Sequence, residues 1–419
     1  MRVLWIVNSL FPEAENLLNG RNVEIQGTGG WLPSLADSLA CSGEIELFVA
    51  SFSSLVSQVK LLKGKSYSYY VLPLFNIIQY DKRYEPFWRE INKECNPDII
   101  HIHGTEFSHG LSYVNTCGSE HTLVSIQGMP SVICDYWYSG LSEKEIRRNI
   151  TLKTLLQGNL IQEKKRREKT TKLYEIELLN KVKFVIGRTS WDKAHTWAIN
   201  PELRYFHCSE TLRAPFYEGQ WKYEQCHPHT IFLSQAGRAL KGVHQLVKAL
   251  PIIKRHYPDV KVRIAGDNII DDSTWKKKMS MSGYGMIMHK MILQYNLKDA
   301  ITFTGPLNAE EMKEEYLRSN VFVSPSSIEN SPNSLCEAQV LGVPCVASYV
   351  GGSMDFIPND RCGKLYRFDD VEMLAKAICD TFEESVNYDN SEMRELALLR
   401  HDREQITNRQ LDIYKKILG

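Results

Sequence analysis

Short runs of β-branched and apolar residues alternate with helical patterns along almost the whole chain. This alternation constrains the fold most, because apolar strands separated by helices are typical of parallel sheets that are covered on both faces. Two series of strands predict two doubly wound α/β domains. The predicted strands are 3–7, 45–50, 70–74, 98–103, 122–126 and 184–187 in the first series, then 230–234, 260–265, 301–304, 321–324 and 344–348.

The length of the chain agrees with two domains, since 419 residues exceed what one hydrophobic core usually supports. A polar stretch that contains Pro215, Gly219 and Pro228 separates the two series of strands. We therefore expect an N-terminal domain over residues 1–220 and a C-terminal domain over residues 221–400. The remaining residues, 401–419, have a helical pattern, and we expect this helix to cross back to the first domain.

Composition excludes several classes of protein. Lys plus Arg equals Asp plus Glu at 50 each, whereas a nucleic-acid binder is usually more basic, so we expect no nucleic-acid partner. The first residues are typical of a strand rather than a signal peptide, and no apolar run approaches a membrane span. The ten cysteines form no Cys-x-x-Cys pair, which favours free thiols and a cytoplasmic location.

The segment from Pro325 to Gly352 has the most specific pattern in the chain. A predicted strand ends just before it, and a loop leads to Ser331 and Pro332. Pro is favoured at the first position of a helix and Ser at the position that caps it, so a helix should begin here. Gly342 then predicts the end of this helix near residue 341.

The start of this predicted helix is a candidate phosphate site. It would lie at the carboxyl edge of a parallel sheet, where ligands of doubly wound folds bind. Unpaired N–H groups at a helix N-terminus attract phosphate, and here they belong to Asn333, Ser334 and Leu335. Glu329 precedes the helix and can reach a sugar hydroxyl, whereas Glu337 within it can accept hydrogen bonds from a ribose.

A second candidate group follows the predicted strand 230–234. Apolar residues at Val243, Leu246, Val247 and Leu250 have the spacing of one helix face. Lys241 therefore lies at a helix start, just beyond a strand end, where an ammonium group can meet a diphosphate.

Together these residues resemble the retaining nucleotide-sugar glycosyltransferases of family 4, in the bacterial polysaccharide-synthesis branch. The motifs that carry the resemblance are Pro325-Ser326, Glu329, Glu337-Ala338, Gly342-Val343-Pro344 and Gly351-Gly352. The resemblance implies the GT-B fold, in which two doubly wound Rossmann-like domains face each other across a cleft. It also implies that Lys241 holds the donor diphosphate. Arg238 stands three residues before Lys241, whereas the family usually has its arginine five or six residues before, and we assign Arg238 the same role.

Further loops complete the expected donor side. Gly266 follows the predicted strand 260–265 and resembles the glycine turn of the family. Gly305 and Leu307 follow the strand 301–304, where the family holds the base through backbone groups. Contacts from the backbone leave no pattern of side chains that would distinguish uracil from guanine. The donor sugar can therefore be UDP- or GDP-linked.

On the first domain, the resemblance implies four groups that face the cleft and the acceptor. They are the glycine pair Gly29-Gly30, then His103, Gln127 and Gly128. Gln127 stands where many relatives have histidine, so we expect hydrogen bonding there rather than acid–base chemistry. His101 and His103 alternate along a strand without a third ligand, and we expect no metal. The segments 187–190 and 209–213 resemble subgroup motifs, and for them a functional and a structural role both stay open.

The region 141–183 is basic, with twelve Lys and Arg against six Glu. We expect a basic helix over residues 144–183. Such a helix can be a solvated face or can contact an anionic surface, and both interpretations stay open. The usual acceptors of the family are lipid-linked, which agrees with peripheral contact at the inner face of the membrane.

The predicted activity is transfer of a hexose from a nucleotide-diphosphate sugar to a glycan or lipid-linked acceptor. The resemblance implies retention of configuration, no cofactor, and a role in cell-envelope polysaccharide biosynthesis. Positive charge from Lys241 and the helix start can assist departure of the diphosphate without a metal. Two alternatives stay open: an epimerase or phosphorylase on the same fold, and a sugar-nucleotide binding protein without catalysis.

Overall fold

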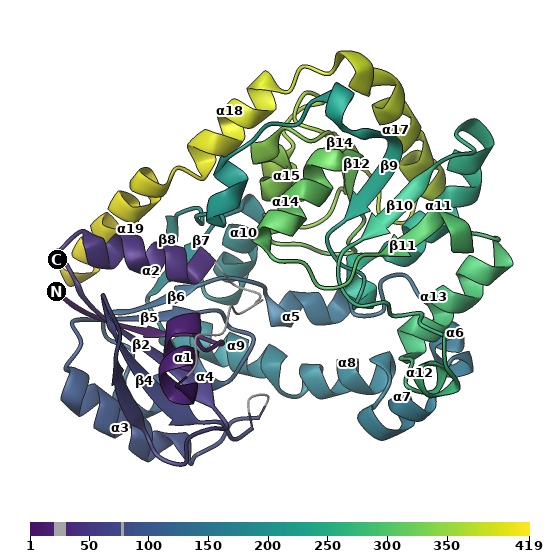
Figure 1. Cartoon of the computed structure of the whole chain (residues 1–419). Coiled ribbons are helices and arrows are strands. Elements are labelled where there is room, and N and C mark those ends of the chain that lie inside the picture. The colour runs from purple at the N-terminus through teal and green to yellow at the C-terminus, as the bar shows by residue number, and fades with distance from the viewer. Residues whose placement is uncertain (21–30, 77–78) are drawn as a thin grey trace. The chain divides into compact units, whose positions relative to one another are not determined.

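The computed structural model describes residues 1–20, 31–76 and 79–419, and these residues form two compact units (Figure 1). Unit 1 comprises residues 1–134, 167–212 and 401–419, whereas unit 2 comprises residues 135–166 and 213–400. Each unit has its own sheet and its own hydrophobic core. The chain thus changes unit at residues 134, 166, 212 and 400.

Within the described part of the chain, unit 1 is built on an eight-stranded sheet in the order β3-β4-β2-β1-β5-β6-β7-β8. Neighbouring strands are parallel except β3 and β4, which are antiparallel. All six strands predicted for this half of the chain are confirmed. The strands are β1 (Arg2–Ile6), β2 (Glu46–Ser53), β3 (Lys60–Lys63), β4 (Ser68–Pro73), β5 (Ile99–His103), β6 (Thr122–Ser125), β7 (Phe184–Gly187) and β8 (Arg204–His207).

The helices of unit 1 connect these strands, as the alternation predicts. They are α1 (Pro12–Asn19), α2 (Trp31–Cys41), α3 (Tyr84–Cys95), α4 (His109–Cys117), α5 (Pro130–Ile133), α9 (Thr171–Lys181), α10 (Ser190–Ile199) and the C-terminal α19 (Arg403–Leu418).

Helix α19 is part of the core of unit 1. Its apolar side chains are buried against residues of the first sheet, at Ile406, Leu411, Ile413 and Ile417. The hydroxyl of Tyr414 accepts a hydrogen bond from Trp5 Nε1 at 2.9 Å and bonds to His101 Nδ1 at 2.7 Å. The other ring nitrogen of His101 lies 2.7 Å from Ser125 Oγ. The end of the chain is therefore held by buried hydrogen bonds to two central strands, β1 and β5.

Unit 2 is built on a six-stranded parallel sheet in the order β11-β10-β9-β12-β13-β14, as seen in its described residues. This order is that of the doubly wound Rossmann fold, in which the first and fourth strands are neighbours. The five predicted strands are confirmed, and β14 is additional. The strands are β9 (His227–Leu233), β10 (Lys261–Ile264), β11 (Ile301–Phe303), β12 (Ser319–Ser324), β13 (Cys345–Ser348) and β14 (Lys364–Tyr366).

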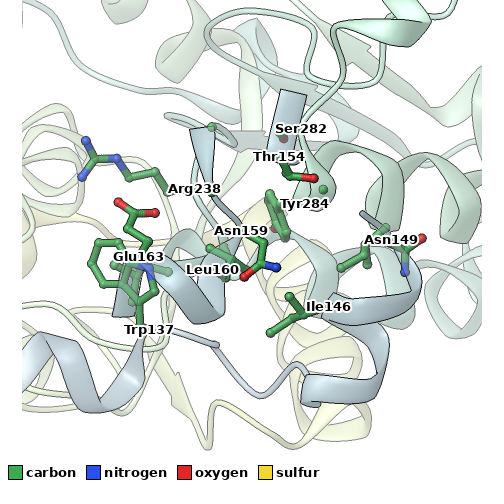
Figure 2. Close-up of a pocket in the computed structure, with 16 residues that line it drawn as sticks. Trp137, Ile146, Asn149, Thr154, Asn159, Leu160, Glu163, Arg238, Ser282 and Tyr284 are labelled. Carbon is green, nitrogen blue, oxygen red and sulfur yellow. The ribbon is translucent and has the colours of Figure 1, made fainter. Parts of the chain in front are cut away.

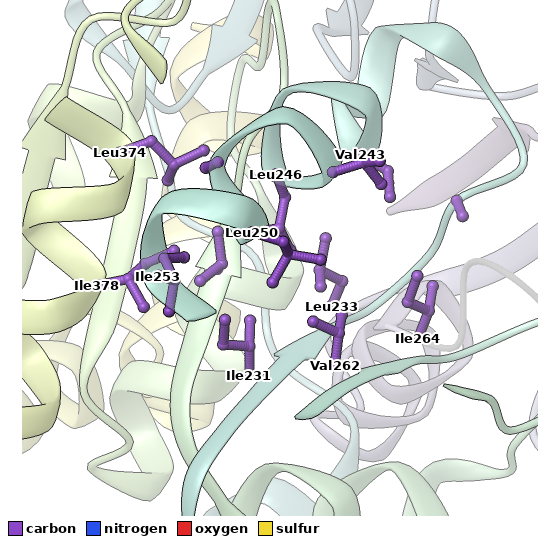
Figure 3. Close-up of a cluster of buried hydrophobic side chains, with 14 of the residues drawn as sticks. Ile231, Leu233, Val243, Leu246, Leu250, Ile253, Val262, Ile264, Leu374 and Ile378 are labelled. Carbon is purple, nitrogen blue, oxygen red and sulfur yellow. The ribbon is translucent and has the colours of Figure 1, made fainter. Parts of the chain in front are cut away.

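Helices α11 and α17 cover one face of this sheet and bury a continuous apolar cluster (Figure 3). Val243, Leu246, Val247 and Leu250 are all buried in it, which confirms the predicted helix face. The helices of unit 2 are α6 (Glu143–Arg148), α7 (Leu152–Gln157), α8 (Leu160–Glu168, which ends in unit 1), α11 (Val243–His256), α12 (Trp275–Met279), α13 (Gly283–Gln294), α14 (Ala309–Arg318), α15 (Asn333–Leu341), α16 (Ser353–Phe356), α17 (Val371–Glu384) and α18 (Ser391–Arg400).

The division into units differs from the predicted boundary at residue 220, because residues 135–166 pack with unit 2. Leu141, Ile146 and Ile161 are buried in the same cluster as the helices of that unit. The expected single helix over residues 144–183 is also wrong. It is four helices, because the cap at Thr151, the turn at Gly158 and the non-helical backbone of Thr170 interrupt it. Its last part, α9, belongs to unit 1.

None of the helices in the described ranges is long and apolar enough to cross a membrane.

Replacing Tyr414 with Phe tests how α19 is held. The change leaves Trp5 Nε1 buried without its acceptor, so we expect a loss of about 1–3 kcal/mol in the free energy of unfolding. The control is Tyr295→Phe at an exposed position of unit 2. Urea titrations followed by tryptophan fluorescence measure both variants. Equal stability of the two would contradict the assigned role of the hydrogen bonds.

Candidate functional site

The switch point of the second sheet brings the predicted donor residues together. Strands β9 and β12 are neighbours at the centre of the sheet, and ligands of such folds bind beyond their carboxyl ends. The loop after β9 leads to Lys241, and the loop after β12 contains Glu329. Two residues that are 88 positions apart in sequence therefore meet at one edge of the sheet.

Lys241 and Glu329 form an ion pair at this edge. Lys241 Nζ donates to Glu329 Oε1 at 2.6 Å, and Ser326 Oγ donates to the same oxygen at 2.6 Å. The described residues give Glu329 Oε2 no hydrogen bond. An ammonium group has three N–H donors, so two of those on Lys241 remain for a ligand. The pair thus offers cationic donors and an anionic acceptor side by side.

Two glycines hold the loops of this site at close range. A Cβ atom on Gly242 would lie 1.6 Å from the carbonyl oxygen of Pro325, and one on Gly351 would lie 1.8 Å from the carbonyl oxygen of Glu329. Both glycines have positive φ, at 65° and 52°. The N–H of Gly352 also donates to the Glu329 carbonyl at 3.0 Å. Only residues without a side chain permit these approaches, which fix the backbone on either side of Glu329.

Helix α15 spans Asn333–Leu341, and Gly342 follows it in the left-handed conformation, which confirms the predicted end of the helix. The capping residue differs from the prediction: it is Pro332, and no side chain caps the helix. The N–H of Leu335 donates to the Pro332 carbonyl at 2.9 Å, so this group is already used within the first turn. Ser334 lies between them, and its carbonyl accepts from Tyr316.

Glu337 is buried within α15 and pairs with Arg213. The guanidinium donates from Nε and Nη2 to the two carboxyl oxygens of Glu337, both at 2.9 Å. The hydroxyl of Tyr316 lies 3.5 Å from Glu337 Oε2. Burial raises the pKa of Glu337 to about 7, and the positive charge of Arg213 acts in the opposite direction. Arg213 is thus a partner of the predicted ribose-binding carboxylate, which sequence spacing alone did not identify.

Arg238 is the remaining residue that the sequence predicts for the donor diphosphate. It lines a cavity of about 200 Å³ whose lining includes neither Lys241 nor Glu329, and Figure 2 shows Arg238 beside Glu163. The walls come from the loop 237–240, the start of α13 and the segment 137–163. Across the 3₁₀ turn of Ala239 to Lys241, the N–H of Lys241 donates to the Arg238 carbonyl at 3.0 Å. The expected role of Arg238 beside Lys241 stays a prediction.

The remaining donor-side residues lie at the ends of β10 and β11. Gly266 and Gly305 pair across these strand ends, and the N–H of Gly266 donates to the Gly305 carbonyl at 2.9 Å. Both have positive φ, and open space surrounds the position of a Cβ atom on each. Leu307 follows, half-buried, just before the cap of α14.

In unit 1, Gln127 belongs to a buried hydrogen-bond network. Gln127 Nε2 donates to Glu210 Oε1 at 2.9 Å, and Arg188 Nη2 lies 2.7 Å from the same oxygen. The side chains of Arg188 and Glu210 are each 6% exposed. Arg188 also donates to the Ile126 carbonyl at 2.7 Å. The segments 187–190 and 209–213 thus meet through this ion pair, at the ends of strands β6 and β7.

His103 lies at the end of β5 among aromatic rings. Its ring centroid is 4.3 Å from that of Trp5 and 3.8 Å from that of His101. Burial lowers its pKa well below the usual value, and the neighbouring His101 adds to this effect. No described residue bonds to its ring nitrogens. His103 is therefore a neutral imidazole at the edge of the first sheet.

Two carboxyl groups lie beside Gly128. The N–H of Gly128 donates to Glu106 Oε1 at 2.9 Å, and the hydroxyl of Thr105 donates to the Gly128 carbonyl and to Glu175. Ser131 N donates to Glu175 Oε2 at 2.7 Å. Burial raises the pKa of Glu175 to about 7, and the charge of Glu106 acts in the same direction. Sequence reasoning missed this pair, since Glu175 reads as one charge of a basic helix.

The structure does not test two expectations, the glycine pair of the first domain and the absence of a metal. The glycine pair Gly29-Gly30 lies outside the described residues. Among those that are described, no three His, Cys, Asp or Glu side chains gather as metal ligands do. The expected absence of a metal stays a prediction.

Comparison with known proteins covers mainly the second unit. Residues 224–395 match the family model described as Glycosyl transferases group 1. A D-inositol 3-phosphate glycosyltransferase of Pseudarthrobacter chlorophenolicus is 31% identical over 140 residues, which are 33% of this chain and 31% of that protein. The chain thus aligns with about a third of the length of that relative. The matched region contains Lys241, Glu329 and Glu337, so the part of unit 2 that holds the predicted donor residues is similar to this family.

Solved structures resemble the chain over its whole length. Sucrose-phosphate synthase from Thermosynechococcus elongatus has a TM-score of 0.72 at 16% identity and covers 99% of this chain and 98% of its own. Anabaena HepE, crystallised with UDP and glucose, has a TM-score of 0.65 at 14% identity, with 99% and 100% covered. The GT-B fold, with two Rossmann-like domains, is therefore confirmed.

Replacing Gly242 with Ala tests the close approach of the two donor loops. The added Cβ would meet the Pro325 carbonyl and strain a positive φ, so we expect unit 2 to lose at least about 2 kcal/mol of stability. Gly237→Ala is the matched control in the same loop, because nothing lies within 4 Å of its Cβ position. Urea titrations compare the two. A Gly242 variant as stable as the control would contradict the structure of this loop.

A pH titration tests the burial of Glu175. Its folded pKa of about 7 exceeds the ordinary value of 4.5, so between these values the folded state binds more protons than the unfolded state. Its contribution to stability is full below 4.5 and is lost as pH rises through 7. We expect wild type to lose on the order of 2–3 kcal/mol relative to Glu175→Gln from about pH 5 to about pH 8.

The matched control for this titration is Glu177→Gln, an exposed position on the same helix. Its difference from wild type should stay constant over the same range. A constant difference for Glu175→Gln as well would show that this carboxyl group is ionised in the folded protein throughout.

Proposed function

We propose that this chain is a glycosyltransferase that moves a hexose from a nucleotide-diphosphate sugar to a glycan or lipid-linked acceptor. The observation that carries the proposal is the pair of Lys241 and Glu329 at the switch point of the second sheet. That edge is where doubly wound folds bind nucleotides, and the pair combines donors for phosphate with an acceptor for a sugar hydroxyl.

The donor diphosphate is assigned to Lys241 and to the start of α15. Lys241 uses one N–H on Glu329 and has two left for phosphate oxygens. Asn333 and Ser334 begin the helix, whose positive end lies toward the same edge. Negative charge grows on the diphosphate as the glycosidic bond breaks, and these groups stabilise it in place. We therefore propose a reaction without a metal or a cofactor.

Glu329 and Glu337 are assigned to the sugars of the donor. Glu329 Oε1 already accepts from Lys241 and Ser326, so Oε2 is the atom that we assign to a hexose hydroxyl. Glu337 is assigned to the ribose. Arg213 favours the ionised form of this buried carboxyl group and fixes its orientation, which suits an acceptor of two hydroxyl bonds.

The base is assigned to the strand ends at Gly266, Gly305 and Leu307. Open space around the two glycines supports a ligand that approaches the backbone closely. The crystallised complex of HepE, which has a similar fold, contains UDP. This supports a uracil nucleotide, and GDP-linked sugars remain the second class to test.

The acceptor is assigned to unit 1, at Gln127, Gly128 and His103. The buried pair of Arg188 and Glu210 holds Gln127 as a hydrogen-bonding group. A neutral His103 likewise supports hydrogen bonding rather than charge. The family resemblance supports retention of configuration and a role in cell-envelope polysaccharide synthesis. All ten cysteines are free thiols, which supports a cytoplasmic location.

Replacing Lys241 with Ala tests this assignment. Loss of the ammonium group removes charge from the departing diphosphate, so we expect the catalytic rate to fall by roughly 10²–10³. The control is Lys376→Ala, which removes an exposed lysine of the same unit. Donors are first chosen by thermal shift with UDP, GDP, ADP and their sugars, since ligand binding raises the melting temperature.

Three outcomes would contradict the proposal. Wild-type turnover in the Lys241 variant would remove this residue from the reaction. Conversion of the donor sugar without acceptor, followed by nuclear magnetic resonance, would identify an epimerase. Donor binding without turnover across a panel of acceptors, phosphate included, would identify a binding protein.

A further inference from the structure

Two short helices of unit 2 expose large apolar side chains to solvent. On α7, Leu152, Leu155 and Leu156 are exposed, the last two by 70% and 80%. On α12, Trp275 is 79% exposed and Met279 is also exposed. We call these five residues the α7/α12 surface. Scattered apolar residues are normal on a protein, but five within two short helices form a patch that needs a partner.

The two helices lie in the same part of unit 2 although more than a hundred residues separate them (Figure 1). Gly283, the first residue of α13 and four positions after the end of α12, contacts α7. A Cβ atom there would lie 3.2 Å from Thr154 Cγ2 on α7 and 3.0 Å from the Asn149 carbonyl. Thr154 is the one buried residue of α7, and it lines the same cavity as Ser282 and Gly283 (Figure 2). The leucines of α7 therefore point away from the unit.

Side-chain caps define where both helices begin. Thr151 accepts from the N–H of Thr154 and begins α7, whereas Thr274 accepts from the N–H of Lys277 and begins α12. Such caps stabilise a helix by about 1 kcal/mol each. The apolar side chains are thus presented by defined helices.

Basic residues surround the patch. Residues 142–157 and 274–281 contain seven Lys and Arg against two Glu. Arg147 pairs with Glu143, and Glu145 is used in the cap at Ser142. Just before α12, Asp271 pairs with Lys277 and Asp272 lies 2.9 Å from His289. For Lys153, Lys276 and Lys278 the described residues provide no carboxylate partner, and all three are exposed. The fringe of the patch therefore has a positive charge that its own surroundings do not neutralise.

We propose that the α7/α12 surface binds an anionic lipid bilayer. Leucine side chains and a tryptophan enter the boundary between headgroups and acyl chains, while lysines beside them meet anionic headgroups. A lipid surface fits better than a protein partner, because its charge is uniformly negative and it needs no matching shape. The surface is distinct from Lys241 and Glu329, and it does not depend on the proposed reaction.

The experiment is vesicle flotation with the full chain in the absence of donor. Vesicles contain phosphatidylcholine alone or an equal mixture with phosphatidylglycerol. We expect flotation only with the mixture, and we expect salt to weaken it. The double variant Leu155→Ser/Leu156→Ser should lower the partition coefficient roughly tenfold or more, and Lys276→Gln/Lys278→Gln should lower it severalfold. Leu399→Ser, at an exposed leucine of α18, is the control and should float as wild type does.

A fluorescence measurement identifies which residue enters the lipid. Vesicles with brominated acyl chains should quench the emission of wild type and of Trp197→Phe, because Trp197 is an exposed residue of unit 1. The Trp275→Phe variant should lose this quenching. Circular dichroism of each variant checks that the fold is unchanged.

Three results would overturn the proposal. One is a failure of wild type to float with anionic vesicles at low salt. The second is flotation that is the same in the leucine variant, which would place the lipid contact elsewhere. The third is self-association of wild type that the leucine variant abolishes, without vesicle binding, which would identify a second copy of the chain as the occupant. Donor binding, measured separately by thermal shift, reports on the proposed function alone.

Discussion

The contact between two backbone loops at the switch point is the constraint on which the second unit depends. Gly242 lies against the carbonyl of Pro325, and Gly351 lies against the carbonyl of Glu329, at distances that exclude any side chain. These contacts are not strong interactions in themselves. They fix the direction in which Lys241 and Glu329 leave the backbone, and an ion pair with long side chains needs such fixing because surface pairs alone contribute little. The ion pair of Lys241 and Glu329 therefore depends on the two glycines that orient its backbone.

The sequence predicted the interior of both sheets and missed three of the four edge strands. All eleven predicted strands are present, because buried strands need continuous apolar runs that are visible in the sequence. The three missed strands, β3, β8 and β14, each lie at an edge of a sheet. An edge strand has one paired side and several exposed positions, so Lys60 and Lys63 in β3 or Arg204 in β8 hide the pattern. An edge strand forms because it can hydrogen-bond to the strand beside it, and its own sequence pattern gives little sign of this.

Some residues of the candidate site could also be predicted from the sequence, and others could not. Lys241, Glu329 and Glu337 could be predicted because each follows from local punctuation by proline and glycine. Arg213 could not be assigned to Glu337, since the two are 124 positions apart and only the fold brings them together. The 3₁₀ turn that joins the backbones of Arg238 and Lys241 is likewise not visible in their spacing. Long-range pairing and short turns of this kind are thus what the sequence leaves undetermined.

Two ion pairs of the candidate site, one in each unit, lie in different environments. In unit 2, Lys241 and Glu329 are partly exposed and keep unused hydrogen-bonding atoms. In unit 1, Arg188 and Glu210 are almost fully buried, and Glu175 is buried without a cation. Buried ion pairs rarely add net stability, because the loss of hydration offsets their attraction. Their effect here is geometric: Arg188 joins the ends of β6 and β7, and Glu210 holds Gln127. The buried pair therefore fixes the position of a neutral hydrogen-bonding group, Gln127, which suits the role in acceptor binding that we propose for it.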